Sequence, residues 1–250
     1  MSRRRLFASP LPAAKVEMTL DDESRHHAQV LRLSVGDELR LFDAAGREAD
    51  ATVVRCDRRA LVCVVEGARD VPAPREQLHL AVCVPKAAKL ELIVRMLTEL
   101  GVASLQLVQS ERAVSKWSGE DGKLERFRRI AIEACAQSEQ AYAPALSAPL
   151  PLAATLVSGA FTRSRYKCAF VERSASAQLP HLLAGDTTEP GIAREVWAIV
   201  GPEGGFAPVE VQLMADHGTD LITLGPAILR VETACVVACA LILDRLRAQA

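Results

Sequence analysis

The pattern of apolar and polar positions changes character part-way along the chain. Short alternating apolar runs at 38–42, 51–54 and 61–65, separated by turn residues, are typical of β-strands. The segment 71–77 (VPAPREQ) then carries two prolines and little that could pack in a core, which favours a linker. The pattern predicts a β-rich domain over residues 1–72 and a second domain over 73–250.

In the second part, apolar runs alternate with segments of helical periodicity. The predicted strands are 79–84, 105–108, 168–171, 196–200 and 221–224. The predicted helices are 89–100, 123–138, 209–217 and a long helix after residue 231. Gly101 directly follows the first of these helices and predicts a C-terminal cap. Strands alternating with helices indicate an α/β domain with a mostly parallel sheet.

The last predicted helix is apolar nearly all round between Val231 and Leu243. A helix of this kind must be covered on several sides. The core of the same chain and a second subunit would both cover it, and the pattern leaves the two alternatives open.

Composition adds limits to this picture. Half of the 250 residues are hydrophobic, and the formal net charge is -1, so a surface for a polyanion must come from local clusters of basic residues. The chain has no apolar run of membrane-spanning length, and its basic start lacks the apolar core of a secretory signal. Its seven cysteines are scattered, without CxxC spacing. We expect a cytoplasmic protein with no membrane span and no metal.

Two glycine-marked segments follow predicted strands, VGPEGGFAPVE from residue 200 and LGPAILR from residue 224. Ligands bind beyond the carboxyl ends of parallel strands, and glycines let the backbone approach them closely. The chain has neither G-x-G nor a phosphate-binding P-loop motif. This elimination favours an adenosyl cofactor without phosphates, S-adenosylmethionine, with two ordinary structural turns as the alternative.

The segments VGPEGGFAPVE and LGPAILRVETA resemble the paired signature loops of the RsmE family, the 16S ribosomal RNA (uracil-N3)-methyltransferases of the SPOUT superfamily. Further matches follow in the family's order: RRRLF, HHAQVLRLSVGD, VPKAAKLE, TELGV, QSERAVSK and IAIEACAQS. The resemblance implies a PUA-like RNA-binding β-barrel over 1–72. It also implies a trefoil-knotted SPOUT methyltransferase domain over 73–250, which dimerises through its helices.

The resemblance places the cofactor in the loops of the knot. The implied cofactor-binding residues are Val171, Glu172, Val200, Gly201, Pro202, Glu203, Gly204, Gly205, Leu224, Gly225, Pro226, Ile228 and Leu229. The alternative for Glu203 is that it only braces its turn.

Methylation at uracil N3 requires that its proton leave and that the charge on O2 and O4 be stabilised. Arginine suits the second task, and a carboxylate could accept the proton. Arg112 and Arg230 are the candidates for electrostatic support, and Glu232 for the proton. Glu232 could also be purely structural, because an acidic residue is favourable at a helix start.

Clusters of basic residues mark the expected RNA surface. The candidates are Arg3, Arg4, Arg5, Arg25, His27, Arg32, Lys86, Lys89 and Lys116. Their contact with phosphates would weaken as salt rises. The alternative is an ordinary solvated face.

The chain departs from the pattern of this family at four positions. Ala136, Glu139, Gln140 and Ala227 stand where the family usually has Glu, Gly, Arg and Arg. If either arginine contacts RNA, that contact is absent here or supplied from elsewhere. The expected partner is 16S rRNA or the small ribosomal subunit. The alternatives are a different RNA base, or a catalytically silent RNA-binding assembly factor.

Overall fold

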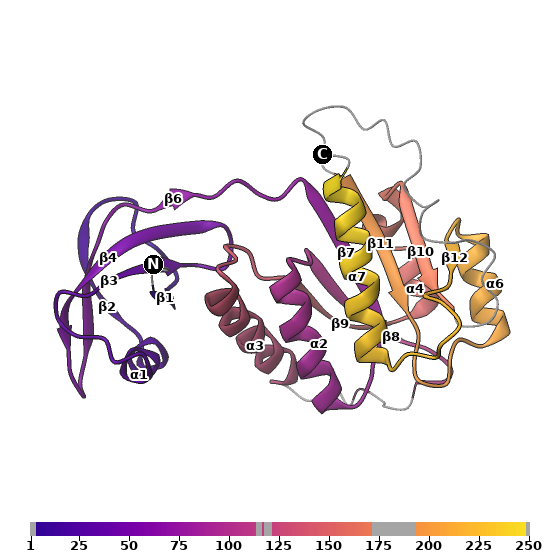
Figure 1. Ribbon diagram of the computed structural model, residues 1–250, viewed down its shortest axis with the longest axis horizontal. Coiled ribbons are helices and arrows are strands. Elements are labelled where there is room, and N and C mark those ends of the chain that lie inside the picture. The colour runs from indigo at the N-terminus through magenta and orange to yellow at the C-terminus, as the bar shows by residue number, and fades with distance from the viewer. Residues whose placement is uncertain (1–3, 114–116, 118–121, 172–193, 249–250) are drawn as a thin grey trace. The chain divides into compact units, whose positions relative to one another are not determined.

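The computed structural model describes residues 4–113, 117, 122–171 and 194–248 (Figure 1). They form two compact units. The first comprises residues 1–73 with 132–143, and the second comprises 74–131 with 144–250. The chain thus leaves the first unit, begins the second, and returns once before completing it.

The first unit is built on a six-stranded sheet with α1 (Asp22–Val30) and the C-terminal part of α3 (Lys123–Ser138), from Ile132 on. The main path of the sheet runs β1–β3–β4–β5–β2, and β6 pairs with β4. Only β1 and β3 are parallel among these pairs. The strands are β1 (Arg4–Phe7), β2 (Val16–Leu20), β3 (Glu38–Phe42), β4 (Arg47–Cys56), β5 (Leu61–Val65) and β6 (Arg69–Asp70). The predictions of strands 38–42 and 61–65 are confirmed with the same bounds, and the predicted 51–54 lies inside the longer β4.

Residues 132–143 are bound into this unit by specific contacts. Gly46 N donates a hydrogen bond to Ala141 O at 3.0 Å, and the Tyr142 hydroxyl donates to Val71 O at 2.6 Å. Gly46 has a positive φ of 98°, and the Tyr142 ring occupies the space that a β-carbon there would need. Only glycine fits this position without rearrangement.

The second unit is an α/β sandwich around a sheet in which every pair is parallel, as expected. The strand order is β12–β10–β11–β7–β8–β9. The strands are β7 (Glu76–Cys83), β8 (Ser104–Gln109), β9 (Ala145–Pro151), β10 (Tyr166–Phe170), β11 (Arg194–Val200) and β12 (Asp220–Ile222). Residues 196–200 are all buried, as both faces of a parallel sheet require.

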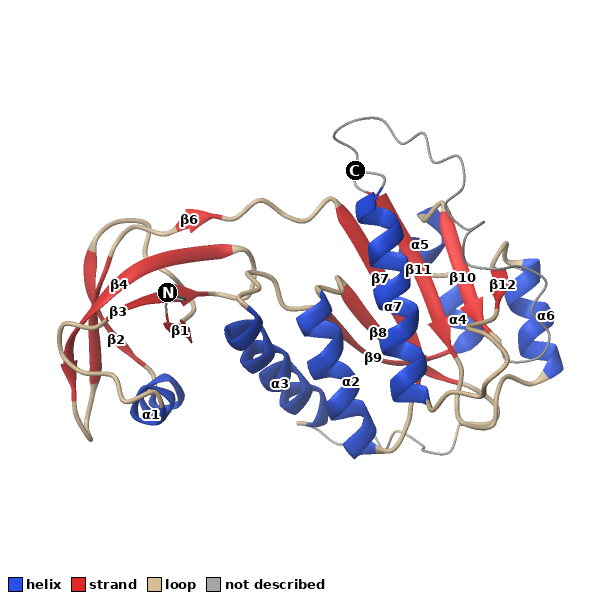
Figure 2. Ribbon diagram, in the orientation of Figure 1, coloured by secondary structure: helices blue, strands red, loops and turns tan. Residues whose placement is uncertain are grey.

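Helices cover both faces of this sheet (Figure 2). On one side α7 (Val231–Ala248) packs on β7 and β11, with α2 (Ala87–Leu100) beside it. The core on the opposite side contains side chains from α4 (Leu152–Leu156), α5 (Gly159–Arg163) and α6 (Pro208–Asp216). The remaining helix, α3 (Lys123–Ser138), has the predicted bounds.

Helix α2 shows how the sequence sets these elements. Leu90, Ile93 and Leu97 are buried on one face, and Gly101 ends the helix with a left-handed φ of 83°. The predicted cap is therefore confirmed, although Leu100 is only half-buried. The linker prediction was too long, because β7 already begins at Glu76.

Helix α7 is covered by its own chain on one side. Its buried positions are Val231, Cys235, Ala238, Cys239, Ile242, Leu243 and Leu246. Leu241 is 44% exposed, so the other side is not fully covered within the chain. No helix in the described part of the chain is long and apolar enough to span a bilayer. The trefoil knot stays a prediction.

Candidate cofactor site

A cavity of about 360 Å³ lies at the carboxyl ends of β10 and β11 in the second unit. Two segments surround it, which we call the first glycine loop (Gly201–Phe206) and the second glycine loop (Thr223–Leu229). The strand ends contribute Phe170, Val171 and Val200 to the lining. This volume is within the range of small-molecule and cofactor sites. The two sequence segments singled out by their glycines therefore share one hollow.

The first glycine loop follows β11 and approaches other groups closely. A β-carbon at Gly201 would lie 2.9 Å from Cε2 of Phe206, so this position has no room for a side chain. Gly205 has a φ of 67° and donates from its N–H to Pro202 O at 2.9 Å. The loop is a tight turn whose backbone faces the cavity.

The second glycine loop follows β12 and leads directly into α7. The Thr223 hydroxyl donates to Gly225 O at 3.0 Å and accepts from Gly225 N at 3.2 Å. Gly225 has a φ of 119°, a conformation that favours glycine. Pro226 and Ile228 are exposed and do not line the cavity, although both were predicted to bind the cofactor.

An ion-pair cluster joins the first glycine loop to the starts of α2 and α7. Lys89 Nζ lies 3.0 Å from Glu203 Oε1 and 3.5 Å from Glu232 Oε2. The hydrogen bond to Glu203 raises the pKa of Lys89. Partial burial acts to raise the pKa of Glu203, but the bond from Lys89, together with a backbone hydrogen bond and the nearby positive charge, lowers it overall. Lys89, predicted as an RNA contact, is thus engaged with two carboxylates.

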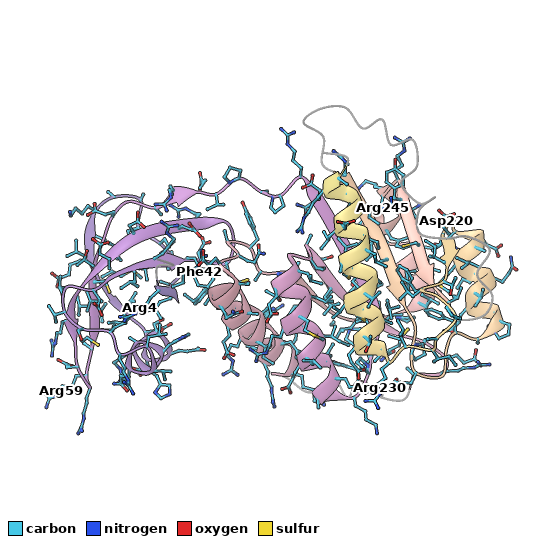
Figure 3. All side chains as sticks on the ribbon, viewed as in Figure 1. Arg4, Phe42, Arg59, Asp220, Arg230 and Arg245 are labelled. Carbon is cyan, nitrogen blue, oxygen red and sulfur yellow. The ribbon has the colours of Figure 1, made fainter. Side chains whose placement is uncertain are left out.

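The three predicted catalytic residues are placed differently. Arg112 lines the cavity, and its Nη1 lies 3.5 Å from both Gly204 O and Phe206 O. Glu232 does not line the cavity, and its Oε2 has no hydrogen-bond partner among the described residues. Arg230 is exposed at the N-terminal end of α7, outside the lining (Figure 3). The structure brings Arg112 to the site but not Arg230.

Most of the predicted cofactor residues line the cavity: Val171, Val200, the five residues 201–205, Leu224, Gly225 and Leu229. Glu172 lies outside the described residues. The sequence interpretation missed other lining residues, namely Phe170, Phe206, Val211, Thr223, Ala227, Val231 and Ala234. Phe206, Ala227, Val231 and Ala234 lie within the quoted motifs, and Val211 and Thr223 directly adjoin them, so the motifs themselves could have identified these residues. Phe170 directly precedes Val171, which was predicted.

The predicted RNA contacts on the first unit fall into two groups. Arg5 is only 7% exposed and pairs with Glu48 at 2.8 Å, so it is a core ion pair and not a free surface charge. Arg4, by contrast, pairs with Asp37 at 2.8 Å at the surface. Arg25 is bonded to Asp22 and to a backbone carbonyl, while Arg32 is exposed.

The other RNA candidates are less constrained. Lys86 is exposed and His27 half-buried. Arg3 and Lys116 lie outside the described residues. In the part of the chain that the structure describes, no cluster of His, Cys, Asp and Glu is suited to a metal ion.

Comparisons with known proteins match this arrangement. An RNA methyltransferase domain model matches residues 72–243, and an RNA methyltransferase PUA domain model matches 20–66. Ribosomal RNA small subunit methyltransferase E of Mycobacterium bovis is 30% identical over 241 residues, covering 93% of this chain and 88% of the relative. The chain belongs to the ribosomal RNA small subunit methyltransferase E family. Its fold is accordingly a PUA-like domain followed by a SPOUT-type methyltransferase domain.

Solved structures agree with this fold. A Legionella pneumophila protein in complex with its bound cofactor SAM matches with a TM-score of 0.86 and 25% identity, covering 98% of both chains. Methyltransferase E of Neisseria gonorrhoeae, bound to S-adenosyl methionine, matches in fold with a TM-score of 0.83 and 23% identity, again over 98% of both chains. The chain is an RNA methyltransferase, as its sequence predicted.

Proposed function

We propose that this protein transfers the methyl group of S-adenosylmethionine to N3 of a uridine in 16S ribosomal RNA. The observation that carries the proposal is the single cavity shared by the two glycine loops, with Arg112 at its wall. Family membership supports the reaction class, and the cofactor in the Legionella pneumophila structure supports the methyl donor.

The residues of the cavity suit S-adenosylmethionine in size and chemistry. Phe170, Leu224 and Leu229 offer apolar surface to the adenine ring, and the glycines leave backbone amides and carbonyls accessible. Among the described residues, the charged side chains of the lining are Arg112 and Glu203. When bound, this cofactor supplies an activated methyl group on a sulfonium.

In the proposed reaction, the protein aligns the base and manages its proton. Displacement at the methyl group requires N3 in line with the methyl–sulfur bond, so positioning supplies much of the rate. The guanidinium of Arg112 would stabilise the negative charge on O2 and O4 as the N3 proton leaves. Glu232, which directly follows the lining residue Val231, stays our candidate for the proton acceptor. Arg230, exposed just before α7 and outside the cavity lining, would contact RNA.

The two domains divide the remaining work. We propose that residues 1–72 form the RNA-binding domain and 73–250 the catalytic domain, with exposed Arg32 and Lys86 among the RNA contacts. Homodimerisation through the catalytic domain would cover the outer side of α7, where Leu241 is 44% exposed, and Leu92 of α2, which is 45% exposed. The proposed location is the cytoplasm.

Two measurements test the function. Calorimetric titration of the purified protein with S-adenosylmethionine should show saturable binding, and its absence would leave a silent RNA-binding factor as the better reading. Mass mapping of ribosomal RNA from cells lacking the protein should show the loss of one N3-methyluridine, restored by the wild-type gene but not by Arg112→Ala.

A second candidate function follows from the departures at Ala136, Gln140 and Ala227, where the family usually has charged residues. The protein could then methylate a different RNA base with the same cofactor. In that case the same mapping would show loss of another modified nucleotide, while N3-methyluridine would persist.

A further inference from the structure

Glu210, in the first turn of α6, is a buried carboxylate that binds two separate backbone segments. Glu210 is only 8% exposed to solvent. Glu210 Oε2 accepts from Ala207 N at 2.8 Å, and Oε1 accepts from Glu111 N at 2.9 Å. Ala207 directly follows the first glycine loop, and Glu111 directly precedes Arg112. One side chain therefore joins the cofactor loop to the turn that carries Arg112.

Among the described residues, the turn that carries Arg112 has few other hydrogen bonds to this loop. It follows β8, and β7 separates β8 from β11 in the sheet, so no strand pairing joins the two segments. Within the turn, Ala113 N donates to Ser110 O at 3.2 Å. The contacts of Arg112 Nη1 with Gly204 O and Phe206 O are both 3.5 Å, at the long limit of hydrogen bonding.

The two bonds of Glu210 are short by comparison. Backbone amides that donate to a carboxylate form stronger hydrogen bonds than those that donate to a neutral oxygen. The start of a helix also favours a negative side chain, and Ala207 at the N-cap has no side-chain oxygen of its own to accept from the first-turn amides. In the part of the chain that the structure describes, Glu210 therefore forms the shortest hydrogen bonds that connect the two segments.

We infer that Glu210 is a positioning residue for methyl transfer: it holds the backbone beside Arg112 against the first glycine loop, so that the guanidinium faces the reacting base. The inference rests on the proposed function, which gives Arg112 its role. Glu210 itself does not line the cavity, so it would act through Arg112 and not on the substrate. Misplacement of a catalytic group by about 1 Å can lower a rate on the order of 100-fold.

The substitution Glu210→Gln tests the inference directly. The amide retains one acceptor oxygen but presents an NH₂ group to the other backbone N–H, so one of the two bonds is lost. We expect turnover at saturating cofactor and RNA to fall about 10- to 100-fold, with the dissociation constant for S-adenosylmethionine changing less than about threefold. Asp216→Asn is the matched control, because it makes the same chemical change at an exposed position of the same helix. Its turnover should equal that of the wild type.

A double-mutant cycle separates positioning from general destabilisation. If Glu210 acts through Arg112, Glu210→Gln should produce no further loss of turnover in the Arg112→Ala background. An equal factor of loss in both backgrounds would overturn the inference. Hydrogen exchange at the Glu111 amide is a second measurement. The exchange rate should rise in Glu210→Gln, and an unchanged rate would also overturn the inference.

Two further outcomes are defined. Should Glu210→Gln fail to fold, Glu210→Asp replaces it in the double-mutant cycle with Arg112→Ala. This variant keeps the negative charge and shortens the side chain by one methylene group. If the wild type binds cofactor and methylates RNA while the cycle is additive, only the role of Glu210 is wrong. If the wild type transfers no methyl group to ribosomal RNA, the proposed function is wrong and the role of Glu210 falls with it.

Discussion

The two glycine loops line one cavity, yet they are held in place in different ways. The first glycine loop is fixed by its own Phe206, which packs against Gly201, and by side chains from two helices: Lys89 of α2 pairs with Glu203, and Glu210 of α6 binds the following amide. The second glycine loop depends on its own local bonds. Thr223 bonds to Gly225, while Pro226 and Ile228 are exposed to solvent.

The two loops therefore acquire the shape that binds the cofactor in different ways. Packing and ion pairs give the first loop its shape before a ligand arrives. The shape of the second loop depends on the backbone conformation of one glycine, so more of the entropic cost of ordering it falls at the moment of binding. Substitutions in the first loop should therefore disturb both folding and binding, whereas substitutions in the second should disturb mainly binding.

The largest effect is expected from Gly201→Val. A β-carbon would lie 2.9 Å from Cε2 of Phe206, a ring only 9% exposed, so the ring or the loop must shift. Overpacking of this kind costs about 1–3 kcal/mol of folding free energy. We expect a lower Tm and at least about 100-fold weaker binding of S-adenosylmethionine, measured by calorimetry and thermal unfolding. The double variant Gly201→Ala with Phe206→Leu should recover part of the stability lost by Gly201→Ala alone, and no recovery would argue against a steric cause.

A smaller, more selective effect is expected from Gly225→Ala. The φ of 119° strains any other residue, while nothing within 4 Å would meet the new β-carbon. Strain of about 1–3 kcal/mol should weaken cofactor binding roughly tenfold. The Tm should change little, because an exposed loop can relax. Ile228→Ala in the same loop, 59% exposed and outside the lining, is the control. A fall in Tm as large as that of Gly201→Val would remove the distinction between the loops.

The position of both loops could be predicted from the sequence because the signal is local. Glycine and proline directly after an apolar strand mark a turn at the carboxyl edge of a sheet, and residues 201–205 lie where the pattern places them. The ends of the strands were less predictable. Strand β12 ends at Ile222, two residues before the predicted end, and Leu224 belongs to the loop.

Partners that are distant in sequence could not be predicted. The sequence shows that Lys89 and Arg5 are basic, and both were expected to contact RNA. In the fold, Lys89 pairs with Glu203, 114 positions away, and Arg5 lies buried against Glu48. Charge patterning marks a residue as charged but does not identify the element that folds against it. For the same reason the sequence does not identify the bond of Glu210 to the Glu111 amide, 99 positions away, although Glu210 is the last residue of the motif VGPEGGFAPVE.

Short or edge elements were also missed. Strand β9 is not among the predicted strands, because it contains Pro149 and Pro151, but it lies at the edge of the sheet, where a missing N–H is tolerated. Conversely, Glu139 stands where the family usually has glycine, and it adopts a left-handed φ of 59° after α3. Tertiary contacts impose a conformation there that the residue itself does not favour.

A modest effect is expected from Lys89→Met, which removes the cross-link between the first glycine loop and the start of α7. The pair is partly solvated, with Lys89 31% and Glu203 29% exposed, so screening limits its contribution. We expect cofactor binding to weaken about two- to fivefold. Lys86→Met, at an exposed neighbouring position with the same change in charge, should have less effect. Equal effects of the two variants would mean that overall charge, and not the bridge, supports the loop.

The smallest effect is expected from Glu203, the acidic partner of Lys89, and concerns how the free energy of unfolding depends on pH. The pKa of Glu203 is lowered in the folded protein, because the bond from Lys89 and a backbone bond outweigh the opposing effect of partial burial. A depressed carboxylate pKa contributes stability that is fully present above the ordinary value of 4.5 and is lost as pH falls through the folded value. The difference in unfolding free energy between wild type and Glu203→Gln should therefore be constant from pH 7 to about pH 5.5 and shrink below pH 4.5. Urea unfolding of both variants at several pH values measures it. If this difference in unfolding free energy grows on acidification, burial and not Lys89 determines the direction in which the pKa of Glu203 is shifted. The first glycine loop would then lack one of the interactions that distinguish it from the second.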